Sequence, residues 1–383
     1  MNGDALSVFA GLKPLSGLDH PREMIRQFTP NWFAATMGTG ILALALPQVP
    51  GWGPKLAPVG EALWFFNMGL FALFGGLYAA RWWLYGDEAR RVFGHNSVSM
   101  FIGTIPMGLA TIINGFLVFG MARFGAGVVP VAELLWWIDV AMALACGVAI
   151  PYLMFTRHEL SLDGMTAVWL LPVVAAEVAG ASGGLLAPHL AAAHSQFVVL
   201  TTSYVLWAYS VPVAFCILAI LILRMALHKL PHDGMAASSW LALGPIGTGA
   251  LGMLLLGTEA PAILSANGLE SIAATARGIG TIAGLLLWGV GLWWLALASM
   301  ITIRYWRGGV PFNLGWWGYT FPLGVYTLAS FKLGRTIGLD FFGVVGTVLT
   351  VALAAMWLLV AAKTLAGGWR GHLFVSPCIA GSN

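Results

Sequence analysis

A long stretch without charged side chains, from Val178 to Leu223, limits what this chain can fold into. A charge at the centre of a bilayer costs about 2.5–3.5 kcal/mol, so long uncharged stretches are typical of membrane-spanning helices. About 20 apolar residues cross a bilayer as one helix, so this stretch is too long for a single span. Pro188, His189 and His194 mark a turn within it. The stretch therefore predicts two adjacent membrane helices.

The composition of the whole chain agrees with this interpretation. Hydrophobic residues make up 59% of the 383 residues, and charged residues only 9%. A soluble domain has about a quarter charged residues, so we expect lipid to cover most of this surface. The net charge of +3 comes without a basic stripe, so nucleic acid is not an expected partner. The cysteines Cys146, Cys216 and Cys378 are too few and too scattered for a disulfide framework or a CxxC site, and we interpret them as packing residues.

The same criterion predicts an all-α integral membrane protein of the cell membrane with ten transmembrane helices. We expect spans near 31–48, 59–83, 98–121, 131–155, 164–187, 195–224, 237–257, 272–302, 315–335 and 339–365. They form one transport domain at 30–366, between a short N-terminal segment at 1–29 and a short tail at 367–383.

The basic residues predict the orientation of these spans. With the N-terminus inside, thirteen lysines and arginines fall in cytoplasmic segments and five fall on the other side. Cytoplasmic loops of membrane proteins carry an excess of Lys and Arg. We therefore expect both termini to be cytoplasmic.

A weak internal repeat of about 70 residues relates the odd-numbered spans. It is marked by one proline in each of these spans: Pro30, Pro106, Pro172, Pro245 and Pro322. Glycines follow each proline within about ten residues. Proline bends a helix, and irregular backbone at membrane depth is tolerated only inside protein or beside a water-filled cavity. The pattern predicts five helical hairpins whose proline-kinked helices line a pore, with the glycines making room for a solute or a neighbouring helix.

Glu177 is the only acidic residue predicted near the middle of a span. An intramembrane carboxylate is a functional candidate because its burial in the charged form is costly. It could carry a proton with the transported solute, or repel an anion when ionised. The alternative is a neutral Glu177 hydrogen-bonded to a neighbouring helix. Asp139 lies nearer the end of its predicted span, and we expect it at the membrane interface.

Further polar residues are weaker candidates. Lys332 and Arg335 end the ninth span, where they could draw anions to a pore mouth or extend to the lipid headgroups. Thr36, Thr39 and Asn114 are small polar groups in odd spans, suited either to replacing part of an anion's hydration or to bonding between helices.

No motif for catalysis or cofactor binding is found in the sequence. The eight histidines lie in predicted loops, tails or span ends, and none is predicted to face another at mid-membrane. A Walker A motif, a GxSxG elbow and an HExxH helix are also absent from the sequence. We therefore expect neither an enzyme nor a bound metal or other cofactor.

Two segments resemble a known family. FTPNWFAATMGTG at Phe28–Gly40 is similar to the first span of the tellurite-resistance/dicarboxylate transporter family. FNLGWWGYTFPLGVYTLASFKLG at Phe312–Gly334 is similar to its ninth span, and to that of its plant relatives, the slow-type guard-cell anion channels. The resemblance implies five hairpins in quasi-fivefold arrangement around a pore, assembled as a homotrimer.

The resemblance also implies a substrate class and a gate. Its substrates are small anions: malate and other C4-dicarboxylates, sulfite, chloride and nitrate. Phe321 matches the phenylalanine that occludes the pore in the channel members, although a lone Phe in a membrane helix would otherwise be a packing residue. The leading hypothesis is transport of C4-dicarboxylates or sulfite, with or without proton coupling. A passive chloride or nitrate channel is the alternative, and an integral-membrane enzyme or sensor is a remote one.

Overall fold

The computed structural model describes residues 14–380. All regular secondary structure in this range is helical, and the range contains no strand. Eight helical segments are long and apolar enough to cross a membrane. They span Gly53–Leu84, Val98–Phe124, Ala126–Thr156, Ala167–His189, Ala193–His228, Asp233–Ala266, Glu270–Gly308 and Asp340–Arg370. The all-helical membrane fold predicted from the sequence is therefore confirmed, with eight spans identified by length and composition.

Two shorter helical segments lie at the remaining predicted positions. The first joins the 3₁₀ turn Pro30–Phe33, helix α3 (Ala34–Ala45) and the 3₁₀ turn Leu46–Gln48. The second joins the 3₁₀ helix Leu314–Tyr319 to helix α14 (Phe321–Ile337). Their 3₁₀ parts rise about 2.0 Å per residue, against 1.5 Å in an α-helix, so these segments reach further than their α-helical lengths indicate.

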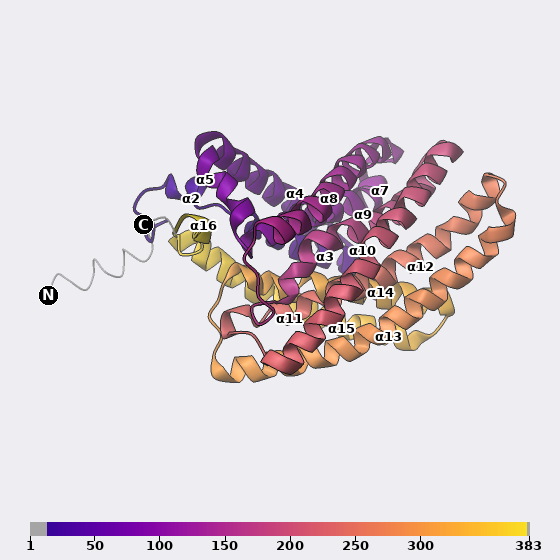
Figure 1. Ribbon diagram of the computed structural model, residues 1–383. Helices are drawn as coiled ribbons and strands as arrows, with labels where there is room; N and C mark the ends of the chain where they lie inside the picture. Colours follow the sequence, from indigo (N-terminus) through magenta and orange to yellow (C-terminus); the bar gives the residue numbers. More distant parts are fainter. Residues whose placement is uncertain (1–13, 381–383) are drawn as a thin grey trace.

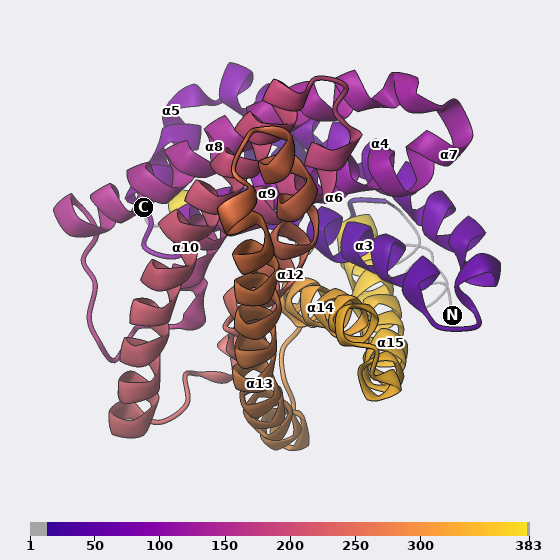
Figure 2. The same ribbon diagram turned by 90° about the vertical axis from the view of Figure 1, so that its right-hand side faces the viewer.

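Burial divides the long helices into two layers (Figure 2). The inner layer contains α3, α6 (Thr104–Gly115), α9 (Leu171–Leu186), α12 (Leu243–Ala266) and α14. The outer layer contains α4 (Gly53–Leu84), α8 (Val129–Thr156), α10 (Ala193–His228), α13 (Glu270–Gly308) and α15 (Asp340–Arg370). The apolar windows that include α6, α9 and α12 are 72–94% buried, whereas those of the outer helices are 17–33% buried. Apolar faces that remain exposed on all five outer helices fit contact with lipid.

The inner helices pack against one another in a closed ring. In order around the ring, α3 contacts α6, α6 contacts α9, α9 contacts α12, α12 contacts α14, and α14 contacts α3. Each outer helix packs against the inner helix that precedes it in the chain, as α4 does on α3 and α15 on α14 (Figures 1 and 2).

The glycines of the inner helices provide close contact between helices. A Cβ atom on Gly108 of α6 would lie 2.3 Å from the Thr36 hydroxyl of α3. A Cβ atom on Gly324 of α14 would lie 2.5 Å from the Ile41 side chain, also on α3. The sequence predicted that these glycines make room either for a solute or for a neighbouring helix. At Gly108 and Gly324 they make room for a neighbouring helix.

The five repeat prolines do not kink the middle of the inner helices, so the prediction of a bend there is wrong. Pro30, Pro172 and Pro322 occupy the first or second residue of their helices, and Pro106 and Pro245 occupy the third. The first-turn N–H groups have no partner within an α-helix, so proline is tolerated there without loss of a hydrogen bond. The prolines therefore mark where each inner α-helix begins.

The two ends of the described chain pack together on one side of the molecule. α2 (Glu23–Arg26) and α16 (Pro377–Ala380) lie close to each other at the left of Figure 1. The buried guanidinium of Arg81 on α4 donates to the carbonyl of Phe28 and, at 3.1 Å, to the hydroxyl of Ser376. The Ser376 amide donates to Gln27 Oε1 at 2.8 Å.

Candidate functional site

A cavity of about 260 Å³ lies where the five inner segments converge. The first residue of α3, α6, α9 and α14 lines it, and α12 contributes its second residue. These are Ala34, Thr104, Leu171, Phe321 and Gly244. The cavity therefore lies at the N-terminal ends of all five inner helices, beside the positions that the prolines mark.

The lining is mostly apolar, with a few polar side chains. Asn31, Ser97, Thr104, Ser238 and Asn313 supply the amide and hydroxyl groups. Among the described lining residues there is no aspartate, glutamate, lysine or arginine. The first amides of α3, α6 and α9 donate to carbonyls of the 3₁₀ turns that precede these helices. The aligned peptide dipoles still make the N-terminal side of a helix partially positive, so five converging helices favour negative charge in the cavity without a fixed cation.

Phe321 lies in the wall of this cavity, as the first residue of α14, and is only 3% exposed. The preceding 3₁₀ helix is capped by Asn313, whose Oδ1 accepts from the amide of Gly315 at 2.8 Å. The indole N–H of Trp317 donates to Thr364 of α15 at 3.0 Å. The WWGYTFP motif thus anchors its tryptophan to a neighbouring helix and presents its phenylalanine to the cavity.

Lys332 and Arg335 lie toward the opposite end of α14. Leu328 lies seven residues after Phe321, Lys332 four residues after Leu328, and Arg335 three residues after Lys332. These spacings place all four side chains on one face of the helix. Leu328 and Lys332 are partly exposed although most of their neighbours are buried, and Arg335 is exposed. The face that begins at the cavity therefore ends in two basic side chains.

Glu259 on α12 is a residue that the sequence did not single out, because the seventh span was predicted to end at residue 257. The helix continues to Ala266, and the Glu259 carboxylate interacts electrostatically with Lys332. The signal that could have found it is that no helix-ending residue lies between Gly257 and Pro261, so the sequence allows the helix to include Glu259.

Glu177 lies in α9 with no exposed surface, and it does not line the cavity. It is directed to α10, where Ser210 is the neighbouring polar group. The Ser210 hydroxyl donates to the carbonyl of Val173 at 2.9 Å, and neither carboxylate oxygen of Glu177 has a hydrogen-bond partner among residues 14–380. Glu177 thus lies between an inner and an outer helix.

Asp139 is not interfacial, and that prediction is wrong. It is fully buried well inside α8, and neither carboxylate oxygen has a partner within the described range. It lies on the same side of α8 as Trp136, whose indole N–H donates to the carbonyl of Ala179 at 2.8 Å. The helix face that a residue occupies, rather than its distance from the span end, determines its burial here.

The remaining candidates are not brought together with the cavity. The hydroxyl of Thr36 donates to the carbonyl of Phe33 at 2.7 Å, and Thr39 accepts from the indole of Trp357 on α15 at 3.0 Å. Asn114 is two turns beyond the cavity-lining Met107 on the same face of α6, and its Oδ1 has no partner in the part of the chain that the structure describes. Of the predicted residues, Phe321 and Pro322 line the cavity.

Comparison with known proteins identifies the family. The family model SLAC1, described as a voltage-dependent anion channel, matches residues 27–365. The chain is 38% identical over 356 residues to the sulfite efflux pump SSU1 of Arthroderma benhamiae, covering 91% of this chain and 93% of that relative. It is 24% identical over 351 residues to the malic acid transport protein of Schizosaccharomyces pombe, covering 88% of this chain and 77% of that relative.

These matches extend over nearly the whole chain and include both segments that carried the resemblance. The chain belongs to the SLAC1 voltage-dependent anion channel family, within the tellurite-resistance/dicarboxylate transporter group, and is a multi-pass membrane protein.

Proposed function

We propose that this protein transports small anions along a path between the five inner segments, with Phe321 occluding the path at the central cavity. The observation that carries the proposal is the convergence of five helix N-termini on a cavity whose wall includes Phe321. Helix dipoles whose N-terminal ends meet at such a cavity favour the binding of anions.

The electrostatics of the cavity suit transport rather than tight binding. A path that conducts must bind its ion firmly enough for it to enter and weakly enough for it to leave. Helix dipoles supply diffuse positive potential, and no fixed basic side chain is present among the described residues of the cavity wall. An anion would therefore be attracted without being held by an ion pair.

Sulfite and malate are the proposed substrates. The sulfite efflux pump of Arthroderma benhamiae and the malic acid transport protein of Schizosaccharomyces pombe both align over most of this chain. Their names indicate small oxyanions, whose oxygens can accept hydrogen bonds from Asn31, Ser97 and Ser238 in the cavity wall.

The proposed architecture has ten spans, including the segments around α3 and α14. They form five hairpins around the axial path, with both termini cytoplasmic. Contact between the two ends of the described chain supports an even number of spans, and the excess of basic residues on the side of the termini supports the orientation. The family further supports assembly as a homotrimer.

Glu177 is the proposed proton carrier of a coupled transporter. Its carboxyl is buried beside Ser210 without a hydrogen-bond partner in the described range, and an isolated buried carboxylate is costly. Its position between α9 and α10 would couple protonation to the packing of an inner helix on its outer partner. The alternative is a passive channel for chloride or nitrate, favoured by a cavity wall without fixed charge.

Flux measurements on purified protein in liposomes test these proposals. Sulfite, malate, succinate, nitrate and chloride are screened one at a time, with protein-free liposomes as the control. Uptake of sulfite or malate driven by an imposed pH gradient supports the coupled transporter. Chloride current driven by membrane potential alone, with no response to a pH gradient, supports the passive channel. No flux of any of the five anions would refute the proposed function.

A further inference from the structure

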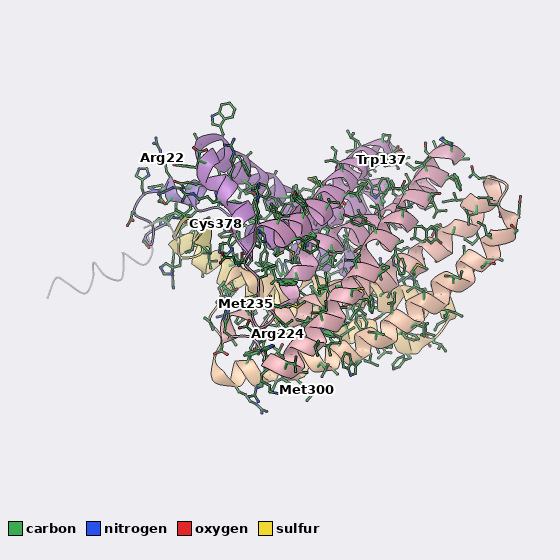
Figure 3. All side chains as sticks on the ribbon, viewed as in Figure 1. Arg22, Trp137, Arg224, Met235, Met300 and Cys378 are labelled. Atoms are coloured by element: carbon green, nitrogen blue, oxygen red, sulfur yellow. The ribbon has the colours of Figure 1, made fainter. Side chains whose placement is uncertain are left out.

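A second, more polar recess of about 460 Å³ adjoins the central cavity. It lies between the segments around residues 96–97, 159–169 and 230–235. Ser97, Val168, His232 and Met235 line both the recess and the central cavity. Met235 and Arg224, which also lines the recess, lie near each other toward the same end of the molecule in Figure 3. The recess and the cavity therefore meet at these four shared residues.

His232 is the only ionisable residue among the described residues that line the central cavity. It is exposed, and within residues 14–380 its ring forms no hydrogen bond. A charge placed at this position would act directly on an anion that passes between the recess and the cavity.

The loop that carries His232 is fixed by hydrogen bonds from three different elements. Arg224 of α10 donates to the carbonyl of Lys229 at 2.5 Å, and the hydroxyl of Tyr305 of α13 donates to the carbonyl of Pro231. The side-chain amide of Asn313 donates to the carbonyl of Gly234 at 2.9 Å. These bonds hold the main chain on both sides of His232, so its place at the junction is set by the fold.

The other charged or titratable groups around this loop carry both signs. They come from the recess, from the end of α10, from the loop itself and from the end of α13: Glu159, Asp163, Arg224, His228, Lys229, Asp233, Arg304 and Tyr305. Arg224 is only 4% exposed, and its guanidinium donates to the carbonyls of Asp163 and Lys229. The carboxylates of Glu159 and Asp163 would repel an anion that enters through the recess.

We propose that anions pass between the recess and the central cavity beside His232, so that the charge of the side chain at position 232 determines how readily they enter. This inference rests on the proposed anion transport. A unit charge a few ångströms from an ion in water contributes about 1 kcal/mol, which corresponds to roughly a fivefold change in local anion concentration.

The test compares sulfite exchange flux of the wild type with that of His232→Lys and His232→Glu in proteoliposomes. The two substitutions place opposite charges at the junction, and flux is measured at low and at high ionic strength because salt screens an exposed charge. His228→Lys and His228→Glu are the matched controls, because His228 ends α10 nearby but does not line either cavity.

At low ionic strength His232→Glu is expected to lower the flux by about threefold to tenfold, and His232→Lys is expected not to lower it. The difference between the two variants is expected to shrink at high salt, while the two His228 variants stay near the wild type. Equal flux through His232→Lys and His232→Glu at low ionic strength would overturn the route beside His232 while leaving anion transport intact. Absence of sulfite flux in the wild type would overturn the proposed function, and the inference with it. Because the ring is exposed, both variants are expected to fold, which a thermal melt verifies.

Discussion

Replacement of Phe321 by alanine tests whether this side chain blocks the proposed path or only packs in the core. The side chain is the first of α14, it is 3% exposed, and it forms part of the wall of the central cavity. Truncation to alanine removes the ring from the proposed path. The helix itself is retained, because Pro322 and the capped 3₁₀ helix before it are unchanged.

The structure sets the size of both expected effects. Truncation of a fully packed phenylalanine destabilises a protein by about 3–5 kcal/mol. Phe321 borders a cavity of about 260 Å³ but is only 3% exposed, so we expect a loss toward the lower end of this range, about 3 kcal/mol. If the ring is the barrier, a reduction of only about 1.4 kcal/mol in that barrier raises flux tenfold.

The assay measures anion flux and thermal stability on the same preparations. Phe341→Ala is the matched control, because Phe341 is 59% exposed on α15 and does not line the cavity. We expect flux through Phe321→Ala to rise at least about tenfold, while flux through the control stays near the wild-type value. A Phe321→Ala protein that melts at a lower temperature but transports at the wild-type rate would show that the ring only packs.

Three further changes test the proposed proton carrier, the charge at the end of α14 and an ion pair outside the site. Glu177→Gln should abolish the response of sulfite uptake to an imposed pH gradient, and a retained response would remove Glu177 from the coupling. Lys332→Gln should lower the rate of anion uptake by about twofold to fivefold at low ionic strength and much less at high salt, which a salt series of uptake rates checks. The hydrogen bonds from Arg26 lower the pKa of the Glu88 carboxyl from its usual 4.5, so this pair stabilises the protein above pH 4.5 and the stabilisation is lost as the pH falls through the lowered pKa. The difference in melting temperature between the wild type and Glu88→Gln should therefore be constant near neutral pH and should shrink below pH 4.5; a difference that persists unchanged at lower pH would contradict this account.

The positions of the helices could be predicted because membrane insertion depends on charge along the chain. Helical segments occur at all ten predicted ranges. These ranges could be identified because intervals without charged residues can be read directly from the sequence. The burial of Asp139 could not be predicted in this way. Distance from a span end says nothing about the face of a helix, and Asp139 shares its face with the fully buried Trp136.

Residues of the candidate site could be predicted only where they belong to a contiguous sequence motif. Phe321 was found through WWGYTFP, whose residues are contiguous in sequence. His232 and Glu259 were missed because their significance depends on distant partners: Asn313 and Tyr305 fix the loop of His232, and Lys332 is the neighbour of Glu259. Contacts between residues far apart in sequence leave no pattern in a single chain.

The repeat prolines were found correctly but interpreted incorrectly, and the correction changes the account of the proposed path. A proline in mid-helix would free one carbonyl, which presents partial negative charge to the interior. A proline in the first turn instead places the N-terminal end of the helix dipole at the cavity, where it presents partial positive charge. At the other end of α14, Lys332 and Arg335 lie on the same face as Phe321, with Glu259 of α12 beside Lys332. The attraction for an anion at the cavity therefore comes from the backbone, and the apolar ring of Phe321 is the barrier that we propose the anion meets there.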